Sequence, residues 1–300
     1  MKVLSLFDGI SCARAALERA GIKVDAYFAS EIDKNAIAIA QKNYPDTKQI
    51  GSVTDVRVEN EGVVWEGGGF KFSTKIDLLI GGSPCQDLSI SKMGRQGLDG
   101  TRSNLFFDYV RIRDEVKPKW WILENVASMS DESRDKMSEV LGVQPILIDA
   151  ALVSAQERRR YFWTNIPGIQ QPADQGIFLR DILIPESEKP RRFLEIKQPI
   201  RTTVKGVAWD TSGNGHYSQQ NRARRIDQKS PTLPTCRTVT KTKIVIDGRV
   251  GELHIEEMER LQGLPDRYTE GIPSKEKRGG AIGNGFNVEV VKHILSYIPR

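Results

Sequence analysis

Cysteine is scarce in this chain, which has only Cys12, Cys85 and Cys236 among its 300 residues. The three lie too far apart for the closely spaced cysteine pairs that bind zinc, and any disulfide would leave one of them over. The sequence therefore predicts no metal site and favours reduced thiols, as in a cytoplasm-like compartment.

Long apolar runs are also missing. No segment approaches the roughly 20 residues that a membrane-spanning helix needs. The acidic Asp8 interrupts the short apolar run near the N-terminus, so we expect no signal peptide. With 39% hydrophobic and 28% charged residues, the composition is ordinary for a globular protein. We expect a soluble, cytoplasmic protein with no membrane partner.

The excess of basic residues is small, with 44 Lys and Arg against 39 Asp and Glu, a net charge of +5. Such a charge is compatible with a polyanionic partner, but it is also common in proteins that have none. The distribution says more, because basic residues gather in one third of the chain. These basic residues indicate either a solvated basic face or contacts to nucleic-acid phosphates. They are Arg191, Arg192, Arg222, Arg224, Arg225, Lys229, Arg237, Lys241 and Lys243.

Strand-like and helix-like segments alternate through the first half of the chain. Apolar runs over 3–7, 26–30, 76–80 and 120–123 are separated by stretches with apolar residues at helical spacing. This alternation predicts an α/β fold, a Rossmann-like, doubly wound and mostly parallel sheet with helices on both faces. In such sheets ligands bind beyond the carboxyl ends of the strands. Four polar residues follow predicted strands there: Asp8, Glu31, Cys85 and Glu124.

The character of the sequence changes after about residue 185. Prolines become frequent, helical periodicity fades, and short β-like pieces take its place until about residue 254. We therefore predict one domain of residues 1–185 that is completed by 254–300. A smaller, irregular, β-containing domain occupies 186–253.

The first predicted strand ends in Phe7-Asp8-Gly9-Ile10, which resembles a nucleotide-binding turn. A glycine lets the backbone approach a ligand, and Glu31 lies where an acidic residue can hold ribose hydroxyls. The full GxGxxG pattern is absent, which disfavours a dinucleotide and hence an NAD-dependent oxidoreductase. A nucleoside cofactor without phosphates is compatible with this turn, and so is an ordinary turn between a strand and a helix.

Cys85 follows Gly81-Gly82-Ser83-Pro84 directly after a predicted strand. A lone cysteine is more often a small buried hydrophobe than a nucleophile. Here the preceding residues form a tight loop at the ligand-binding edge, where a helix N-terminus or nearby arginines would favour the thiolate. Cys85 is therefore a candidate nucleophile.

Glu124 directly follows the apolar run at 120–123. It is either a solvated residue at a strand end or a group that shares a proton with a base in an active site. Arg158 and Arg160 alternate onto one face of a further predicted strand. They could donate in parallel to a phosphate or a carbonyl, or they could belong to a surface charge run.

In their order and spacing, these motifs resemble those of the C5-cytosine DNA methyltransferases. The resemblance covers nearly the whole chain and leans toward the branch with the eukaryotic de novo enzymes, while the compact length is similar to bacterial or phage members. Phe7-Asp8-Gly9, Pro84-Cys85, Glu124-Asn125-Val126 and Gln156-x-Arg158-x-Arg160 resemble motifs I, IV, VI and VIII. Ser230-Pro231-Thr232-Leu233 resembles motif IX, the run from Glu259 to Asp266 the segment before motif X, and Gly283-Asn284-Gly285-Phe286 motif X.

The resemblance implies a class I methyltransferase that transfers a methyl group from S-adenosylmethionine to C5 of a cytosine flipped out of duplex DNA. Cys85 would add to C6 of the base, and Glu124 would bind and protonate N3. Arg160 would contact O2, and Arg158 would support the site near the phosphate. The loop from Ser89 to Gly100 would close over the base as a lid.

The resemblance also implies the cofactor contacts, and it implies no metal. Two departures from the family pattern concern this site: Ser11-Cys12 stands where many members have a second glycine, and Thr54 replaces a glycine. The contacts are Phe7, Asp8, Gly9 and Ile10 around the methionine end, Glu31 on the ribose, Ile32 on adenine, Asp55 and Val56 at its amino edge, and Asn284 near the methionine moiety.

Residues 186–253 would recognise the target sequence in double-stranded DNA. A tRNA cytosine-5 methyltransferase and a catalytically silent DNA-binding homologue are the alternatives, although silent homologues typically lose the cysteine or the cofactor turn. We expect a monomer; the residues do not decide whether a cognate restriction endonuclease is a partner. Candidate DNA-reading residues are Thr203, Lys205, Ser212, Asn214, His216, Gln219, Gln220, Asn221 and Arg222.

Overall fold

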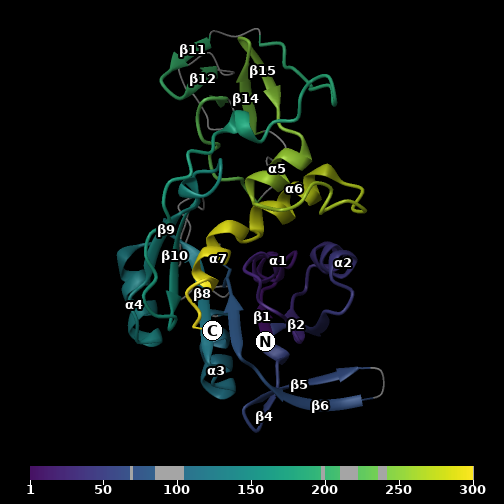
Figure 1. Ribbon diagram of the computed structural model, residues 1–300, viewed down its shortest axis with the longest axis vertical. Helices are drawn as coiled ribbons and strands as arrows, with labels where there is room; N and C mark the ends of the chain where they lie inside the picture. The colour runs from purple at the N-terminus through teal and green to yellow at the C-terminus, as the bar shows by residue number, and fades with distance from the viewer. Residues whose placement is uncertain (68–69, 85–104, 197–199, 210–221, 236–241, 300) are drawn as a thin grey trace. The chain divides into compact units, whose positions relative to one another are not determined.

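The computed structural model describes residues 1–299 except 68–69, 85–104, 197–199, 210–221 and 236–241 (Figure 1). Contacts within the chain divide it into two compact units. Unit 1 consists of Met1–Asp149, Arg159–Gln171 and Val290–Arg300, and unit 2 of Ala150–Arg158 and Pro172–Glu289. The division into a catalytic domain of 1–185 with 254–300 and a recognition domain of 186–253 stays a prediction.

Unit 1 is built on a seven-stranded sheet with the order β3-β2-β1-β7-β8-β10-β9. Neighbouring strands from β3 to β8 are parallel, and β10 is antiparallel to both β8 and β9. The predicted Rossmann-like, mostly parallel sheet is thereby confirmed. The strands are β1 (Lys2–Leu6), β2 (Ala26–Ser30), β3 (Lys48–Gly51), β7 (Leu78–Gly81), β8 (Trp120–Val126), β9 (Ile146–Asp149) and β10 (Arg159–Thr164).

Local sequence signals set the helix ends in unit 1. The carboxylate of Asp33 accepts hydrogen bonds from the backbone N–H groups of Asn35 and Ala36, and Ser130 caps the N–H of Ser133 in the same way. Gly142 ends its helix in the left-handed conformation, where glycine has no Cβ penalty. The helices are α1 (Cys12–Arg19), α2 (Lys34–Asn43), α3 (Leu105–Val116) and α4 (Asp131–Leu141); α7 (Val288–Leu295) leads from unit 2 back into unit 1.

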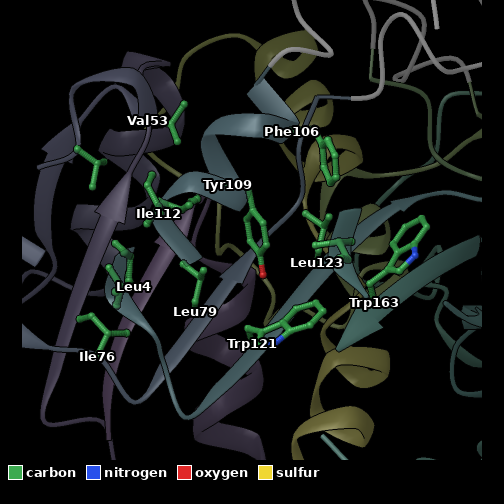
Figure 2. Close-up of a cluster of buried hydrophobic side chains, with 14 of the residues drawn as sticks. Leu4, Val53, Ile76, Leu79, Phe106, Tyr109, Ile112, Trp121, Leu123 and Trp163 are labelled. Atoms are coloured by element: carbon green, nitrogen blue, oxygen red, sulfur yellow. The ribbon is translucent and has the colours of Figure 1, made fainter. Parts of the chain in front are cut away.

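One face of the sheet packs on α3 in a buried core (Figure 2). Tyr109 and Ile112 of α3 lie among Leu79 of β7 and Leu123 of β8. Packing is tight at Gly81, where an added Cβ would lie 3.1 Å from the Tyr109 ring and 3.1 Å from the Leu6 carbonyl oxygen. This close packing fixes the end of β7, immediately before the run that leads to Cys85.

A separate three-stranded sheet in unit 1 comprises β4 (Val58–Glu59), β5 (Gly62–Gly67) and β6 (Phe70–Lys75). The hydrophobic pattern does not predict it, because three consecutive glycines from residue 67 interrupt the alternation. Glu61 lies between β4 and β5 and forms ion pairs with Lys75 and Lys117, at 3.2 and 2.9 Å.

Unit 2 contains a five-stranded sheet in the order β11-β12-β13-β14-β15, followed by two helices. Only β13 and β14 pair in parallel. The elements are β11 (Ile200–Thr203), β12 (Gly206–Trp209), β13 (Arg222–Arg225), β14 (Lys243–Ile246), β15 (Arg249–Glu252), α5 (Ile255–Leu261) and α6 (Lys275–Asn284). In the described part of the chain, no helix combines the length and apolar character that a bilayer crossing requires.

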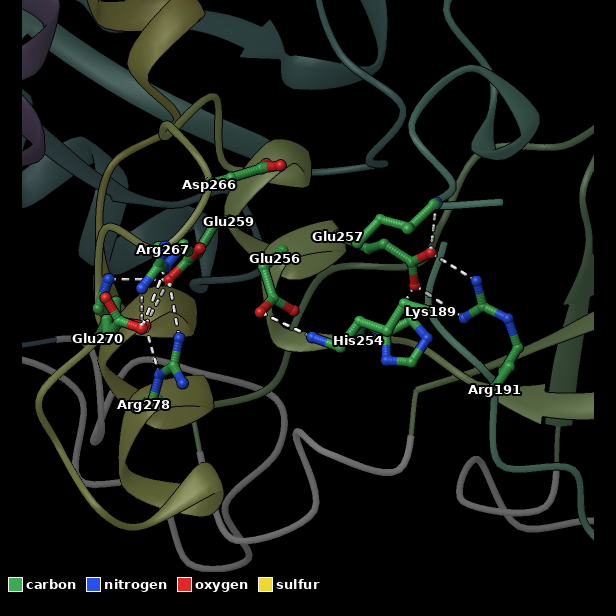
Figure 3. A network of polar contacts seen from close by, with 12 residues as sticks. Lys189, Arg191, His254, Glu256, Glu257, Glu259, Asp266, Arg267, Glu270 and Arg278 are labelled. Atoms are coloured by element: carbon green, nitrogen blue, oxygen red, sulfur yellow. Dashed lines mark hydrogen bonds and ion pairs between the residues drawn. The ribbon is translucent and has the colours of Figure 1, made fainter. Parts of the chain in front are cut away.

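A buried ion pair joins the chain entering the five-stranded sheet to the helix that follows it (Figure 3). Both Nη atoms of Arg191 donate to the Glu257 carboxylate, at 2.8 and 2.5 Å, and Arg191 also donates to the Glu252 carbonyl at 2.7 Å. Glu257 accepts further hydrogen bonds from the N–H groups of Ile184 and His254. Because these partners satisfy the buried carboxylate, breaking the pair from one side would leave an uncompensated charge.

Candidate active site

The turn after β1 has an unusual backbone. Phe7, Gly9 and Ser11 all have positive φ angles, of 57°, 62° and 60°. For a bulky residue such as Phe7 this conformation is strained, and strain of this kind gathers at functional sites. A Cβ on Gly9 would meet no atom within 4 Å, so the space beside this turn is open.

Asp8 holds this turn from inside the protein. Its carboxylate is buried and accepts hydrogen bonds from the hydroxyls of Tyr27 at 2.7 Å and Ser11 at 2.5 Å. Burial raises the pKa of the Asp8 carboxyl, while the hydrogen bonds from Ser11 and Tyr27 oppose that rise. The carboxylate is therefore a structural part of the turn, and the backbone of Phe7 to Ile10 is what the turn presents.

Glu31 connects the end of β2 to the same turn. One carboxylate oxygen accepts from the N–H of Gly9 at 2.8 Å, and the other accepts from the N–H groups of Ile32 and Asp33, at 2.7 and 2.9 Å. The neighbouring Ile32 side chain is 74% exposed, which is unusual for so large an apolar group. The sequence-predicted residues Gly9, Glu31 and Ile32 thus lie together at the carboxyl edge of the sheet.

Asp55 and Val56 follow β3, the strand beside β2. Asp55 is the last residue of a short 3-10 helix, Val53–Asp55, that Ser52 caps. Its side chain is exposed and accepts a hydrogen bond from Thr54, whereas Val56 is buried in the core. Of these two predicted contact residues, only Asp55 presents its side chain at the surface of unit 1.

A charged pair lies on β8 and β10. Phe162 of β10 is opposite Glu124 of β8, so Arg160, two residues from Phe162, is on the same face as Glu124. Arg160 Nε is 2.8 Å from Glu124 Oε1, and the two side chains are only 14% and 13% exposed. The structure thus brings the two predicted site residues together, and such a charge-assisted hydrogen bond fixes the orientation of the carboxylate.

Asn125, the residue after Glu124, has a role that the sequence alone does not reveal. It is buried and donates through Nδ2 to Ser83 Oγ at 3.1 Å. Ser83 belongs to the run that precedes Cys85, so this bond ties that run to the end of β8. In the sequence, the signal for this role of Asn125 is its position directly after the candidate acid Glu124. Cys85 and the predicted lid from Ser89 to Gly100 lie outside the described residues.

The two arginines of Gln156-x-Arg158-x-Arg160 belong to different units, because Arg158 is in unit 2 and Arg160 in unit 1. Arg158 is 4% exposed and donates to the carbonyl oxygens of Gly283 and Gly285. Asn284, between these glycines, is exposed and also belongs to unit 2. Among the described residues, no group of three His, Cys, Asp or Glu side chains could hold a metal ion.

Comparisons with known proteins agree on one family. The model of the family described as C-5 cytosine-specific DNA methylase matches residues 1–166 and 174–300. Type II methyltransferase M.HhaI of Haemophilus parahaemolyticus is 28% identical over 98% of this chain and 93% of its own. Type II methyltransferase M.Sau96I of Staphylococcus aureus is 28% identical over 97% of this chain and 74% of its own.

Solved structures support the fold. A variant of Spodoptera frugiperda DNMT2 aligns with a TM-score of 0.63 and 15% identity, over 99% of this chain and 98% of its own. The Dnmt2 methyltransferase of S. pombe aligns with a TM-score of 0.62 and 18% identity, over 99% and 97%. At such low identity these likenesses concern the architecture alone.

Proposed function

The chain belongs to the family of C-5 cytosine-specific DNA methylases, and from this membership we propose how its residues methylate the base. As a DNA (cytosine-5-)-methyltransferase, it transfers a methyl group to C5 of cytosine, and DNA is its substrate. The observation that carries the proposed mechanism is the pairing of Glu124 with Arg160 at 2.8 Å. An acid held by a guanidinium is suited to binding the polar edge of a cytosine.

We propose that Cys85 starts the reaction, because C5 of cytosine is a poor nucleophile. Addition of the Cys85 thiolate to C6 breaks the C5–C6 double bond and moves its electron pair to C5. Glu124 donates a proton to N3 as this pair develops. After the methyl group is on C5, a water molecule takes the C5 proton, and the electron pair of that C–H bond restores the C5–C6 double bond. The C6–S bond breaks, Cys85 leaves as the thiolate, and N3 returns its proton to the Glu124 carboxylate.

Arg160 orients both the acid and the base in this proposal. Its Nε engages Glu124, and its Nη1 donates to the carbonyl of Arg159 at 2.9 Å. A guanidinium carries five donors in a planar fork, so Nη2 is suited to hold O2 of the cytosine. The base must leave the double helix to reach these groups.

S-adenosylmethionine is the proposed methyl donor, and when bound it supplies an electrophilic methyl group. The residues at the edge of the sheet fit it: Gly9 leaves open space, Ile32 offers an apolar surface to adenine, and Glu31 is placed for ribose hydroxyls. Asp55 at the adenine amino edge and Asn284 at the methionine end complete the proposed contacts.

Ile32 provides a test of the cofactor site. Ile32→Ala is expected to weaken S-adenosylmethionine binding roughly five- to thirtyfold, because the lost methyl and methylene groups no longer cover the adenine. Titration calorimetry measures this change, and the melting temperature should stay near that of the wild type because the side chain is exposed. Val204→Ala is the matched control, since Val204 is 91% exposed and belongs to unit 2. Equal cofactor affinity for both variants would contradict this contact.

Mechanism-based trapping tests the proposed reaction itself. Duplex DNA with 5-fluorocytosine in place of cytosine should form a complex that survives denaturing electrophoresis, because no proton can leave C5 and Cys85 stays attached. The complex should require S-adenosylmethionine, and the same duplex with cytosine is the control. Absence of a complex on DNA known to be methylated would refute thiol attack. Trapping on fluorinated tRNA instead of DNA would favour the alternative substrate.

We further propose a monomer that acts on double-stranded DNA in a bacterial or phage-infected cytoplasm, with a cognate restriction endonuclease as a candidate partner. Thr203, Lys205 and Arg222 of unit 2 are proposed DNA-reading residues. Thr203 donates to the Gly206 carbonyl, and Lys205 lies 3.3 Å from Glu157. The other proposed DNA-reading residues, Ser212, Asn214, His216, Gln219, Gln220 and Asn221, lie outside the described residues.

A further inference from the structure

The C-terminal end of α6 is held by side chains from elsewhere in unit 2. A helix leaves its last carbonyl groups without partners inside the helix. Here Gln262 Nε2 donates to the carbonyl oxygens of Ile282 and Gly285, at 2.9 and 2.6 Å. Arg158 Nη2 donates to those of Gly283 and Gly285, at 3.1 and 2.9 Å. Four hydrogen bonds thus hold the backbone on both sides of Asn284.

Burial separates the two sides of this turn. Arg158, Gln262, Gly283 and Gly285 are buried, whereas Asn284 is exposed. The donors therefore lie inside the unit, and the Asn284 side chain is the group that the turn presents to its surroundings. The Arg158 guanidinium donates into the unit, to the carbonyls of Gly283 and Gly285.

The donors are themselves held in place. Gln156 Nε2 donates to Gln262 Oε1 at 2.9 Å, and Gln156 Oε1 accepts from the N–H of Leu233. Because Gln262 Oε1 is used as an acceptor, its Nε2 is the group left to face the two carbonyls, which fixes the amide orientation. An added Cβ on Gly283 would lie only 2.5 Å from the Pro234 carbonyl oxygen. The backbone of Leu233 and Pro234 thus packs directly on the turn.

Electrostatics favour the same arrangement. The C-terminal end of a helix carries partial negative charge on its free carbonyls, and a cation there is stabilising. Arg158 supplies that cation at the end of α6. The charge of this arginine is used within unit 2, at the turn that carries Asn284.

We propose that Arg158 and Gln262 are positioning residues that hold the Gly283–Gly285 turn so that Asn284 meets the cofactor. The inference rests on the proposed role of Asn284 at the methionine end of S-adenosylmethionine. It gives Arg158 a different task from the support of the site near the phosphate that the family resemblance implies.

Gln262→Leu and Arg158→Met remove the donors while keeping much of the side-chain volume. Each variant is expected to weaken S-adenosylmethionine binding about tenfold, as loss of buried hydrogen bonds does, with DNA affinity at fixed salt unchanged. Arg158→Lys should recover part of the loss, because its ammonium group can still donate to the carbonyls. Weaker DNA binding with a reduced salt dependence, and normal cofactor affinity, would instead identify Arg158 as a phosphate contact and overturn the inference.

A double-mutant cycle with Asn284→Ala separates positioning from general destabilisation. If Gln262 acts through Asn284, Gln262→Leu should cause no further loss of cofactor affinity in the Asn284→Ala background. Arg191→Met is the matched control: it breaks another buried arginine network of unit 2 and should lower the melting temperature without changing cofactor affinity.

The outcomes distinguish this inference from the proposed function. Unchanged cofactor binding in Asn284→Ala would refute the role of Asn284 itself. If Asn284→Ala binds the cofactor more weakly and Gln262→Leu adds its full loss of cofactor affinity to that, the positioning role of Gln262 would be refuted. The role of Asn284 at the cofactor would then stand.

Discussion

Cys85→Ser is expected to lower the rate of methyl transfer by more than about 10⁴-fold, as removal of a catalytic nucleophile does in other enzymes. The serine hydroxyl is a far weaker nucleophile than a thiolate at neutral pH, so addition to C6 becomes the limiting step. S-adenosylmethionine binding should stay within about twofold of the wild type, because no proposed cofactor contact involves this sulfur.

Transfer of a labelled methyl group to duplex DNA measures the first effect, and calorimetry with S-adenosylmethionine measures the second. Cys236→Ser is the matched control and should retain activity close to the wild type. The same assay on 5-fluorocytosine DNA should trap the control variant and leave Cys85→Ser free. Methyl transfer by Cys85→Ser at the wild-type rate would contradict the covalent mechanism.

Glu124→Gln is expected to reduce kcat by about 10²- to 10⁴-fold, the usual contribution of a positioned acid. The amide has the same shape and can still accept a hydrogen bond from Arg160, so the strand pair β8–β10 should remain intact. What it cannot do is give a proton to N3 as negative charge develops on the ring. The melting temperature and the affinity for S-adenosylmethionine are therefore expected to change little.

Steady-state kinetics on duplex DNA, together with thermal denaturation, measure this prediction. Glu132→Gln is a suitable control, because Glu132 is an exposed carboxylate in the first turn of α4. It should leave kcat unchanged. An active Glu124→Gln variant would mean that water or another group protonates the base, and the pairing with Arg160 would then have only a structural role.

Much of unit 1 follows from local patterns. The apolar runs and the helical spacing between them predict the parallel strands, and the position of Glu31 directly after β2 follows from them. Glu124 lies within β8 instead of after it, because the ladder with β10 continues through Asn125 and Val126. The pairing of Glu124 with Arg160 needs one further fact, the antiparallel register of β10 on β8. That register depends on the packing of the whole sheet, which a single sequence does not specify.

The sequence alone does not predict the structural roles of Asp8 and Arg158. A strand-end aspartate can face a ligand or the interior, and only the positions of Tyr27 and Ser11 decide that it faces inward. Arg158 alternates with Arg160 in the sequence, yet its partners are carbonyls about 125 residues further along the chain. Contacts of such separation arise from tertiary packing and leave no local signature.

The Arg191–Glu257 pair has a consequence for how the five-stranded sheet, the proposed location of DNA-reading residues, can change in sequence. Arg191 precedes β11, and its partners Glu252 and Glu257 are at the end of β15 and just beyond it, so the two ends of the five-stranded sheet are tied together. The N–H of Leu194 also donates to the Val250 carbonyl at 2.8 Å. Once the ends of a segment are joined, doubling its length costs only about 0.6 kcal/mol of closure entropy. The stretch between them can therefore lengthen, shorten or be exchanged as a cassette, while the turn at Asn284 and the strands of unit 1 keep their sequence.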